Sequence, residues 1–284
     1  LMIRRPPRST QGVSSAASDV YKRQFADSPD HNAPDASGVG PVPMNNPNGI
    51  RFSTALGYLT PARHRLNLTI RPNCVTRKII FEGKRAVAVE VESGGERFTV
   101  DAGDVILSSG AIGSPHIMLL SGVGPADNLG EIGIPVIHEL PGVGQNLRDH
   151  PMVFTTWQTK PDYPLDGFAP RVQTILRWTA EGSNVRNDLL IFMQSYATDR
   201  NYRGVGDVPP LGIRMIASLE LQLSAGELRL TSNDPDEQPS LDYRYLQYDE
   251  DLRRMREAVR PVSYTHLRAH ETDSYLVCRL LLEK

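Results

Sequence analysis

The sequence predicts a mixed α/β fold, with α+β character, in which a part containing a strand–turn–helix unit precedes a part built on an antiparallel sheet. Two observations carry this prediction. Residues 104–122 combine a short apolar run with a glycine-rich turn and a helical stretch, whereas the chain after Pro151 alternates between apolar and polar residues. The 284 residues, 39% of them hydrophobic, are enough for one large domain or two smaller ones with a real core.

The strand–turn–helix unit starts with DVILSSG, residues 104–110, which predicts a short buried strand because an apolar, β-branched run ends on small residues. In the helix that follows, Ser114 is placed to cap the N-terminus, Pro115 suits the first turn, and Gly122 suits a left-handed stop. Ligands collect at such strand ends, where a helix offers free N–H groups. An ordinary βα connection has the same spacing, so the pattern alone leaves both interpretations open.

The other elements before residue 151 follow from local signals. Residues 25–50 are rich in Pro, Gly, Asn and Asp and predict an extended surface or lid-like loop. Ser53 can cap a helix that ends near Pro61. The remaining predictions are strands at 66–71, 75–81, 86–92, 97–100 and 105–108, a helix at 126–131, a strand at 135–137 and a turn at 140–146.

After residue 151 the predicted elements suit an antiparallel sheet with one open face. An alternating strand begins at Met152, an amphipathic stretch lies around 172–179, and further strands are predicted at 189–196, 212–223 and 227–231. A helix at 249–260 places Leu252, Met255 and Val259 at helical spacing, with charged residues opposite them. We therefore expect a domain boundary near residue 151.

Composition limits the classes of protein to which the chain can belong. The net charge is −2, and the first 24 residues are basic, so the central part of the chain is acidic and a nucleic-acid partner is not expected. Cys74 and Cys278 are the two cysteines, which predicts neither a disulfide framework nor a cysteine metal site. No apolar stretch approaches the length of a transmembrane segment, and a reducing, cytoplasmic compartment is expected.

The two ends of the chain have no periodicity continuous with the sequence beside them. Residues 1–24 and 263–284 resemble translated sequencing-adapter or vector DNA, and we expect both to be non-native tails outside the fold. For the first segment, a basic, Ser-rich transit peptide or nucleic-acid-binding arm is the alternative. On this interpretation the native protein continues beyond both ends of the central region.

The glycine-rich turn and its helix, GAIGSPHIMLLSGVG at 110–124, resemble the second signature of the glucose–methanol–choline (GMC) family of FAD-dependent oxidoreductases. Four other stretches resemble the family in the right order, and together they cover most of residues 25–260. They are NGIRFSTALGYLTPA (48–62), NLTIRPNCVTRKIIFEGKRAVAVEV (67–91), IGIPVIHELPGVGQNLRDHP (132–151) and GELRLTSNDPDEQPSLDYRYL (226–246). The likeness is greatest to the bacterial branch of choline-dehydrogenase-like and alcohol-dehydrogenase-like members.

The resemblance implies a domain organisation. It implies a partial Rossmann-like FAD-binding domain at 25–150, an antiparallel-sheet substrate domain at 151–250, and a helix at 251–262 that returns toward the FAD domain. It also implies which residues contact the cofactor: Val75 through its backbone, near the adenine, and Ser109, Gly110 and Ala111 at the strand end. Without the resemblance, Val75 is an ordinary β-branched strand residue, and small residues at 109–111 serve sterics alone.

No catalytic residue and no metal ligand is expected in this chain. Asp149 and His150 adjoin each other, but neighbours in sequence seldom face each other, and His150 is expected to be structural. His116 lies in the first predicted turn of the helix, where a positive ring would oppose the helix dipole, so a neutral or exposed imidazole is expected. The other histidines lack ligand spacing, namely His31, His64 and His138, or fall in the suspected tail, namely His266 and His270.

Two family features have no match in the sequence: the G-x-G-x-x-G turn that receives the FAD pyrophosphate, and the C-terminal catalytic histidine. The resemblance thus implies an internal fragment of an enzyme that oxidises a CH–OH donor, a small-molecule alcohol, and passes hydride to flavin N5, with an unknown electron acceptor. The fragment itself is expected to be inactive. The alternatives are a non-catalytic binding or interaction protein on the same scaffold and, more weakly, a nicotinamide-dependent dehydrogenase.

Overall fold

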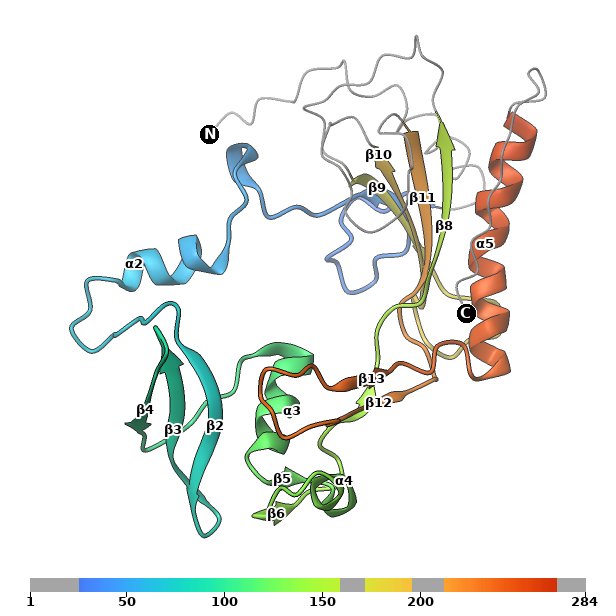
Figure 1. Cartoon of the computed structure of the whole chain (residues 1–284). Coiled ribbons are helices and arrows are strands. Elements are labelled where there is room, and N and C mark those ends of the chain that lie inside the picture. The colour runs from blue at the N-terminus through green and yellow to red at the C-terminus, as the bar shows by residue number, and fades with distance from the viewer. Residues whose placement is uncertain (1–25, 159–171, 196–211, 270–284) are drawn as a thin grey trace. The chain divides into compact units, whose positions relative to one another are not determined.

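A computed structural model describes residues 26–158, 172–195 and 212–269 (Figure 1). Contacts between Cα atoms divide the chain into two compact units. Unit 1 comprises Leu1–Met44, His150–Leu223 and Leu246–Lys284, and unit 2 comprises Asn45–Asp149 and Ser224–Tyr245. The chain therefore passes between the units several times, and each unit is described by itself.

Unit 1 contains a five-stranded antiparallel sheet in the order β1-β9-β10-β11-β8. Its elements are β1 (Gly38–Pro41), β8 (Met152–Gln158), β9 (Val172–Trp178), β10 (Leu189–Ser195), β11 (Gly212–Leu219) and the helix α5 (Asp249–Ala269). The predicted antiparallel strands at 152, 189 and 212 are thus confirmed. The amphipathic stretch at 172–179 is a strand, and the helix predicted at 249–260 extends to Ala269.

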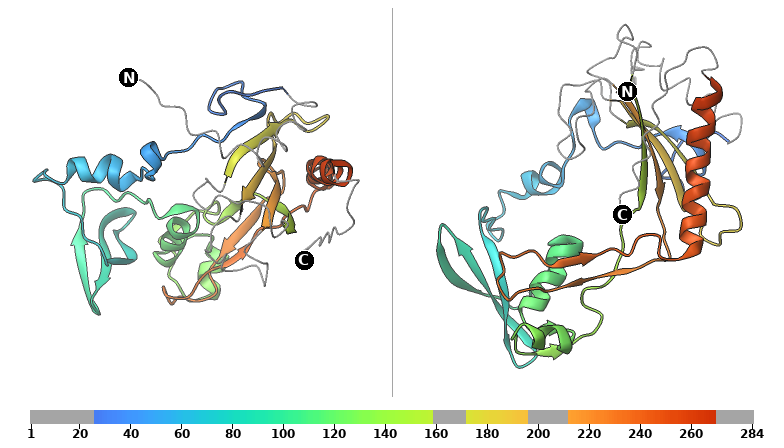
Figure 2. Two further views of the ribbon diagram at one scale, coloured as in Figure 1. Left: turned by 90° about the horizontal axis from the view of Figure 1, so that it is seen from above. Right: turned by 45° about the vertical axis from the view of Figure 1, so that its right-hand side comes forward.

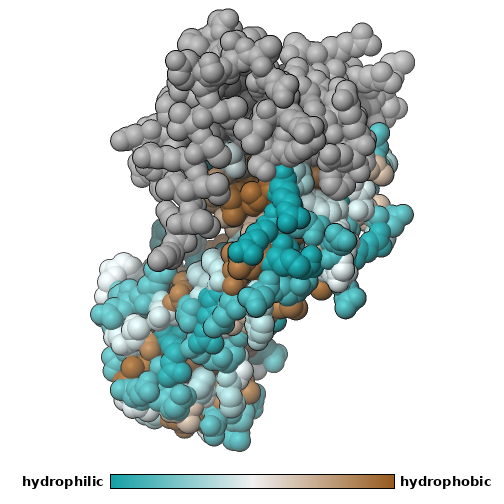
Figure 3. Space-filling model, turned by 90° about the vertical axis from the view of Figure 1, so that its right-hand side faces the viewer, coloured by the Kyte–Doolittle hydropathy of each residue, from teal (hydrophilic) through white to brown (hydrophobic). Residues whose placement is uncertain are grey.

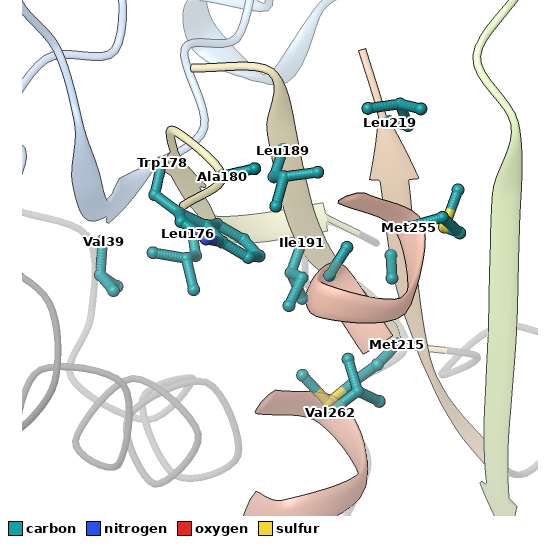
Figure 4. Packing of buried hydrophobic residues seen from close by; sticks show 12 residues of the cluster. Val39, Leu176, Trp178, Ala180, Leu189, Ile191, Met215, Leu219, Met255 and Val262 are labelled. Carbon is teal, nitrogen blue, oxygen red and sulfur yellow. The ribbon is translucent and has the colours of Figure 1, made fainter. Parts of the chain in front are cut away.

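The core of unit 1 lies between one face of the sheet and α5, which runs beside the strands in both figures (Figures 1 and 2). Figure 4 shows Ile191 and Met215 of the sheet beside Met255 and Val262 of the helix. Because successive strand residues point to opposite faces, the odd-numbered residues of β10 and β11 supply this core. The cluster contains Val39, Leu176, Trp178, Ala180, Leu189, Ile191, Met215, Ala217, Leu219, Met255, Ala258 and Val262.

A buried ionic network fixes α5 to the sheet. The Arg254 guanidinium donates to Asp188 Oδ2 at 2.7 Å and to Asp251 Oδ1 at 2.5 Å, and all three side chains are at most 1% exposed. Asp188 also accepts hydrogen bonds from the Ala180 N–H at 2.8 Å and the Ser183 hydroxyl at 2.6 Å. The network therefore joins the start of β10, the β9–β10 loop and the first turns of α5.

Within the segment predicted as an extended surface or lid-like loop at 25–50, β1 is a strand at the edge of the sheet, so this prediction is wrong for residues 38–41, whereas residues 28–37 contain no helix or strand. β1 pairs with β9, and the preceding residues fold back on β1 through hydrogen bonds from Ser28 N–H to the Val39 carbonyl and from Val39 N–H to the Ala26 carbonyl. A Cβ built on Gly40 would lie 1.8 Å from the Ser28 carbonyl oxygen. The glycines that predicted a loop instead allow two backbone segments to touch.

Unit 2 contains an antiparallel three-stranded sheet of β2 (Val75–Glu82), β3 (Arg85–Ser93) and β4 (Glu96–Asp101), confirming three predicted strands. β2 has an irregular register between Thr76 and Lys78, and the residue between them, Arg77, forms ion pairs with Glu92, at 3.1 Å, and with Asp236. These pairs tie the sheet to the segment between β12 and β13.

The rest of unit 2 packs around the helix α3 (Gly110–Leu120) and the shorter α4 (Ala126–Glu131), the latter as predicted. Asn128 joins α4 to Leu230 by two 3.0 Å hydrogen bonds, one to its backbone carbonyl and one from its N–H. The apolar core contains Leu119, Leu129, Val143, Leu228 and Leu230. The small elements here are β5 (Val123–Gly124), β6 (His138–Glu139), β7 (Gln145–Leu147), β12 (Gly226–Arg229) and β13 (Ser240–Asp242).

Several predictions for unit 2 are wrong. Residues 66–71 and 105–108 form no strand, since neither segment pairs with a strand of the described chain, and Leu66 and Ile106 are exposed. The predicted strand at 135–137 pairs slightly later, where His138 in β6 faces Val123 in the parallel β5. The helix predicted from Ser53 to near Pro61 is present, as the π-helical η3 (Ala55–Leu59) followed by α2 (Thr60–Ala62), and Ser53 Oγ accepts the Leu56 N–H at 3.3 Å. A separate 3-10 turn, η2 (Pro47–Gly49), precedes it.

The units differ from the predicted domain ranges at two places: residues 26–44 belong with the sheet of unit 1, and residues 224–245 belong with unit 2. The described residues contain no helix with the length and apolar character needed to cross a membrane. The surface in Figure 3 is mainly hydrophilic, with apolar residues in small groups, which is ordinary for a folded chain.

We predict that Arg254→Met lowers the free energy of unfolding of unit 1 by about 3–5 kcal/mol, because it leaves Asp188 and Asp251 buried without their cation. The matched control is Arg253→Met, whose ion pairs with Glu250 and Glu257 are exposed and should cost less than about 1 kcal/mol. Both tryptophans lie in unit 1, so urea denaturation followed by tryptophan fluorescence measures this difference. Equal losses in the two variants would contradict the prediction.

Candidate functional site

The start of α3 carries three of the four predicted site residues, Ser109, Gly110 and Ala111. The helix begins at Gly110, one turn before the predicted start, and the hydroxyl of Ser114, which lies inside the helix, accepts the Ser109 N–H at 3.0 Å. Ser114 is therefore not the residue that precedes the helix, and Pro115 is interior. Pro115 has no N–H to donate to the Ala111 carbonyl four residues earlier.

Gly110 combines a left-handed backbone with open space around it. Its φ is +81°, and a Cβ built on it would meet no atom within 4 Å. Ser109, Gly110 and Ala111 are all exposed. A flat or anionic group can therefore approach the main chain at this helix N-terminus, so the residues present fit one contact of a dinucleotide cofactor.

The other glycines of the signature serve packing. A Cβ on Gly122, whose φ is +81°, would lie 2.4 Å from the Pro135 carbonyl oxygen, and one on Gly124 would lie 2.3 Å from Leu119 Cδ2. Gly122 also ends the helix as predicted, since its N–H donates to the Leu119 carbonyl at 2.9 Å. The small residues at the end of α3 thus let the chain turn back against its own helix.

Val75, the fourth predicted site residue, begins β2 and is half exposed, with Glu92 as its partner on β3. β2 packs against α3, where the Ile79 N–H donates to Ser121 Oγ at 2.8 Å and the Ser121 hydroxyl donates to the Ile117 carbonyl at 2.6 Å. Val75 and residues 109–111 therefore lie in the same unit on two elements that contact each other. That they form one site stays a prediction.

His116 is held in a neutral form by burial, which lowers the pKa of its imidazole. Its Nε2 atom is buried and has no hydrogen-bond partner among the described residues. This agrees with the expectation of an uncharged ring near the positive end of the helix dipole.

Asp149 and His150 have different partners and fall in different units. Asp149 hydrogen-bonds to Tyr245, and burial together with this carboxylate raises the pKa of the Tyr245 hydroxyl to about 12. His150 Nδ1 lies 3.3 Å from Glu220 Oε2, and its ring is 45% exposed. The two adjacent residues thus contact different partners, and the structural role expected for His150 stays a prediction.

A search of the described residues finds no group of three or more His, Cys, Asp or Glu side chains able to hold a metal ion. Sequence reasoning passed over His31, because it has no ligand spacing, yet its side chain is only 5% exposed. In the sequence, His31 precedes the glycines of β1, and this position alone does not predict that the residue is buried.

The GMC oxidoreductase family model matches residues 9–152, about half of the chain. The chain therefore belongs to the GMC oxidoreductase family, and the resemblance read from the signature at 110–124 is confirmed. The match includes residues 9–24, which the sequence analysis placed outside the fold, so it does not support that exclusion.

Known proteins resemble the chain in sequence and in three-dimensional structure. It is 35% identical to oxygen-dependent choline dehydrogenase 1 of Chromohalobacter salexigens over 253 residues, covering 81% of this chain and 45% of that protein. Pyridoxine 4-oxidase from Mesorbium loti has a TM-score of 0.81 at 22% identity, over 93% of this chain and 52% of that one. A structure of Aspergillus oryzae formate oxidase, solved to examine FAD modification, has a TM-score of 0.78 at 19% identity, over 90% and 53%.

These similarities establish the family from sequence and the fold from structure. The mixed fold with antiparallel sheets is confirmed by the structural neighbours. The chain spans about half the length of the curated relatives it matches.

We predict different costs for alanine at three glycines of unit 2. Gly110→Ala should cost about 1–2 kcal/mol, since only the left-handed backbone opposes it. Gly122→Ala should cost more than about 3 kcal/mol, because the same strain is joined by a clash with a carbonyl oxygen. Gly130→Ala, in α4 with open space and no positive φ, should gain up to about 1 kcal/mol.

The measurement is the free energy of unfolding from urea denaturation followed by far-UV circular dichroism. A Gly122→Ala variant as stable as Gly110→Ala would show that the turn at Pro135 moves freely, contrary to the packing described above.

Proposed function

We propose that this chain is part of an FAD-dependent oxidoreductase that oxidises a CH–OH donor, a small-molecule alcohol, to the carbonyl product. The observation that carries the proposal is the family match over residues 9–152. The choline dehydrogenase relative supports an alcohol as the substrate class, and the formate oxidase neighbour supports FAD as the cofactor.

The chain's own residues would hold one part of the cofactor. Gly110 supplies an open main-chain surface, Ser109 and Ala111 flank it with small side chains, and Val75 offers the backbone at the start of β2. A single such backbone hydrogen bond contributes about 1 kcal/mol net, so these residues orient the cofactor and do not account for tight binding. When bound, FAD would supply the acceptance of hydride from the alcohol.

The antiparallel sheet of unit 1 is the proposed substrate domain. α5 covers the face of the sheet that carries Met215, Ala217 and Leu219. The alternate residues of β11 therefore face the other way, and among them the Arg214 guanidinium lies 5.2 Å from the centre of the Phe154 ring. We propose that this second face is turned toward the substrate, and that the protein works in the reducing cytoplasm that its few cysteines suggest.

The test is to purify the full-length gene product that carries this sequence and record its visible absorbance before and after adding a panel of alcohols. The expected result is a yellow protein whose flavin bands bleach anaerobically with at least one alcohol. A folded, colourless protein would instead favour the non-catalytic binding protein.

In that full-length protein, Gly110→Val should abolish flavin loading, because a β-branched side chain cannot take the φ of +81° and would occupy the open surface. His116→Ala on the same helix should leave flavin loading nearly intact, since its Nε2 atom is buried and we assign the ring no contact with the cofactor. The measurement is the flavin-to-protein absorbance ratio, with circular dichroism to establish folding. A folded Gly110→Val protein with full flavin occupancy would show that the residues of the signature serve packing and do not contact the cofactor.

A further inference from the structure

His31 is a buried histidine on the segment that edges the sheet of unit 1. The residue is 5% exposed and both ring nitrogens are buried, and the main chain of Ile175 in β9 is the hydrogen-bonding group beside the ring. A buried imidazole is tolerated as a neutral, largely apolar ring. Its charged form carries two N–H donors and has the main chain of Ile175 as a partner for one of them among the described residues.

His31 lies within residues 26–41, a segment we call the strap. The strap folds back on itself, so that Ser28 N–H donates to the Val39 carbonyl at 2.7 Å and β1 forms the edge of the sheet against β9. A Cβ built on Gly40 would lie 3.0 Å from His31 Nε2, so the ring is packed directly against β1. The main-chain carbonyl of His31 also accepts a 3.3 Å hydrogen bond from Arg177 of β9.

The charges around the ring oppose its protonation. Arg177, on the neighbouring strand, is positive, and together with burial, which is the larger cause, it lowers the pKa of His31. Asp30, on the strap itself, and the main chain of Ile175 act in the opposite direction without reversing the effect. β1, the other element packed against the ring, carries no titratable side chain.

We propose that the strap is a pH-sensitive edge of the sheet, which stays docked while His31 is neutral and opens when the ring takes up a proton. Opening releases the imidazole to water and moves its charge away from Arg177. The proposal rests on the packing of the strap and is independent of the proposed enzymatic function.

The direction of the pH effect follows from linkage. The open strap exposes His31 with its ordinary pKa of about 6.5, whereas the docked strap lowers that value, so the open state binds more protons in the window below 6.5. Docking is therefore unaffected above pH 7 and weakens as the pH falls. The ratio of open to docked strap should rise as the pH falls through 6.5, by less than a factor of ten for each pH unit, and become constant below the docked-state pKa.

The experiment is amide hydrogen exchange by NMR on this chain between pH 8 and pH 5.5, with rates corrected for intrinsic exchange at each pH. The amides of Ser28 and Val39 report on the strap, and those of Ile191 and Ala217, in the central strands, report on the sheet. We expect protection at Ser28 and Val39 to fall from pH 6.5 to pH 5.5, by at most about fivefold, while the central strands keep theirs.

His31→Phe and His31→Gln are two neutral replacements, one apolar and one polar, so that one remains informative if the other does not fold. In either variant the protection of the strap should become independent of pH. The matched control, His150→Gln, removes an exposed ring paired with Glu220 and should keep the wild-type response. The proposal is overturned if the strap and the central strands lose protection together, if wild-type protection does not change with pH, or if the response survives in a folded His31 variant.

Discussion

The sheet of unit 1 and its helix depend on one buried cation, Arg254, held between Asp188 and Asp251. A guanidinium and two carboxylates carry a net negative charge, and the interior accepts it because Asp188 receives the Ala180 N–H and the Ser183 hydroxyl while Asp251 receives the Leu223 N–H. Apolar contacts alone would let α5 slide along the sheet, since they are not directional. The network fixes its register, and with it the choice of which sheet face α5 covers.

That choice determines what the second face can do. Once α5 covers the side chains of Met215 and Ala217, the alternation along β11 directs Arg214 and Ile216 to the opposite face. The strap adds a further layer at the edge, where Gly38 and Gly40 let backbone contact backbone. The electrostatic network therefore acts on the sheet at the face covered by α5, and the glycine contacts act at its β1 edge.

Much of the fold could be predicted where the partners of a segment are close in sequence. The strands at 75–82, 85–93 and 96–101 follow one another through short turns, so periodicity and turn residues sufficed. The strap could not be predicted, because its pairing partner on β9 lies more than a hundred residues away and its glycines also suit a loop. The same reasoning failed in the other direction at 105–108, where an apolar run predicted a strand that has no neighbour among the described strands.

Part of the candidate site could likewise be predicted from residue spacing, and the rest depends on contacts that only the three-dimensional structure shows. The signature at 110–124 predicted a turn with room for backbone approach, and Gly110, with its left-handed backbone and empty surroundings, has that room. In the sequence, Gly122 and Gly124 cannot be told apart from Gly110. In the structure they are required because Pro135 and Leu119 occupy the space that a Cβ atom would need. A side chain at a glycine kept for packing clashes in any ligation state, whereas a side chain at Gly110 meets only the strain of the left-handed backbone until a ligand must bind. Gly110 is the one position of the three at which loss of binding and loss of folding can be separated.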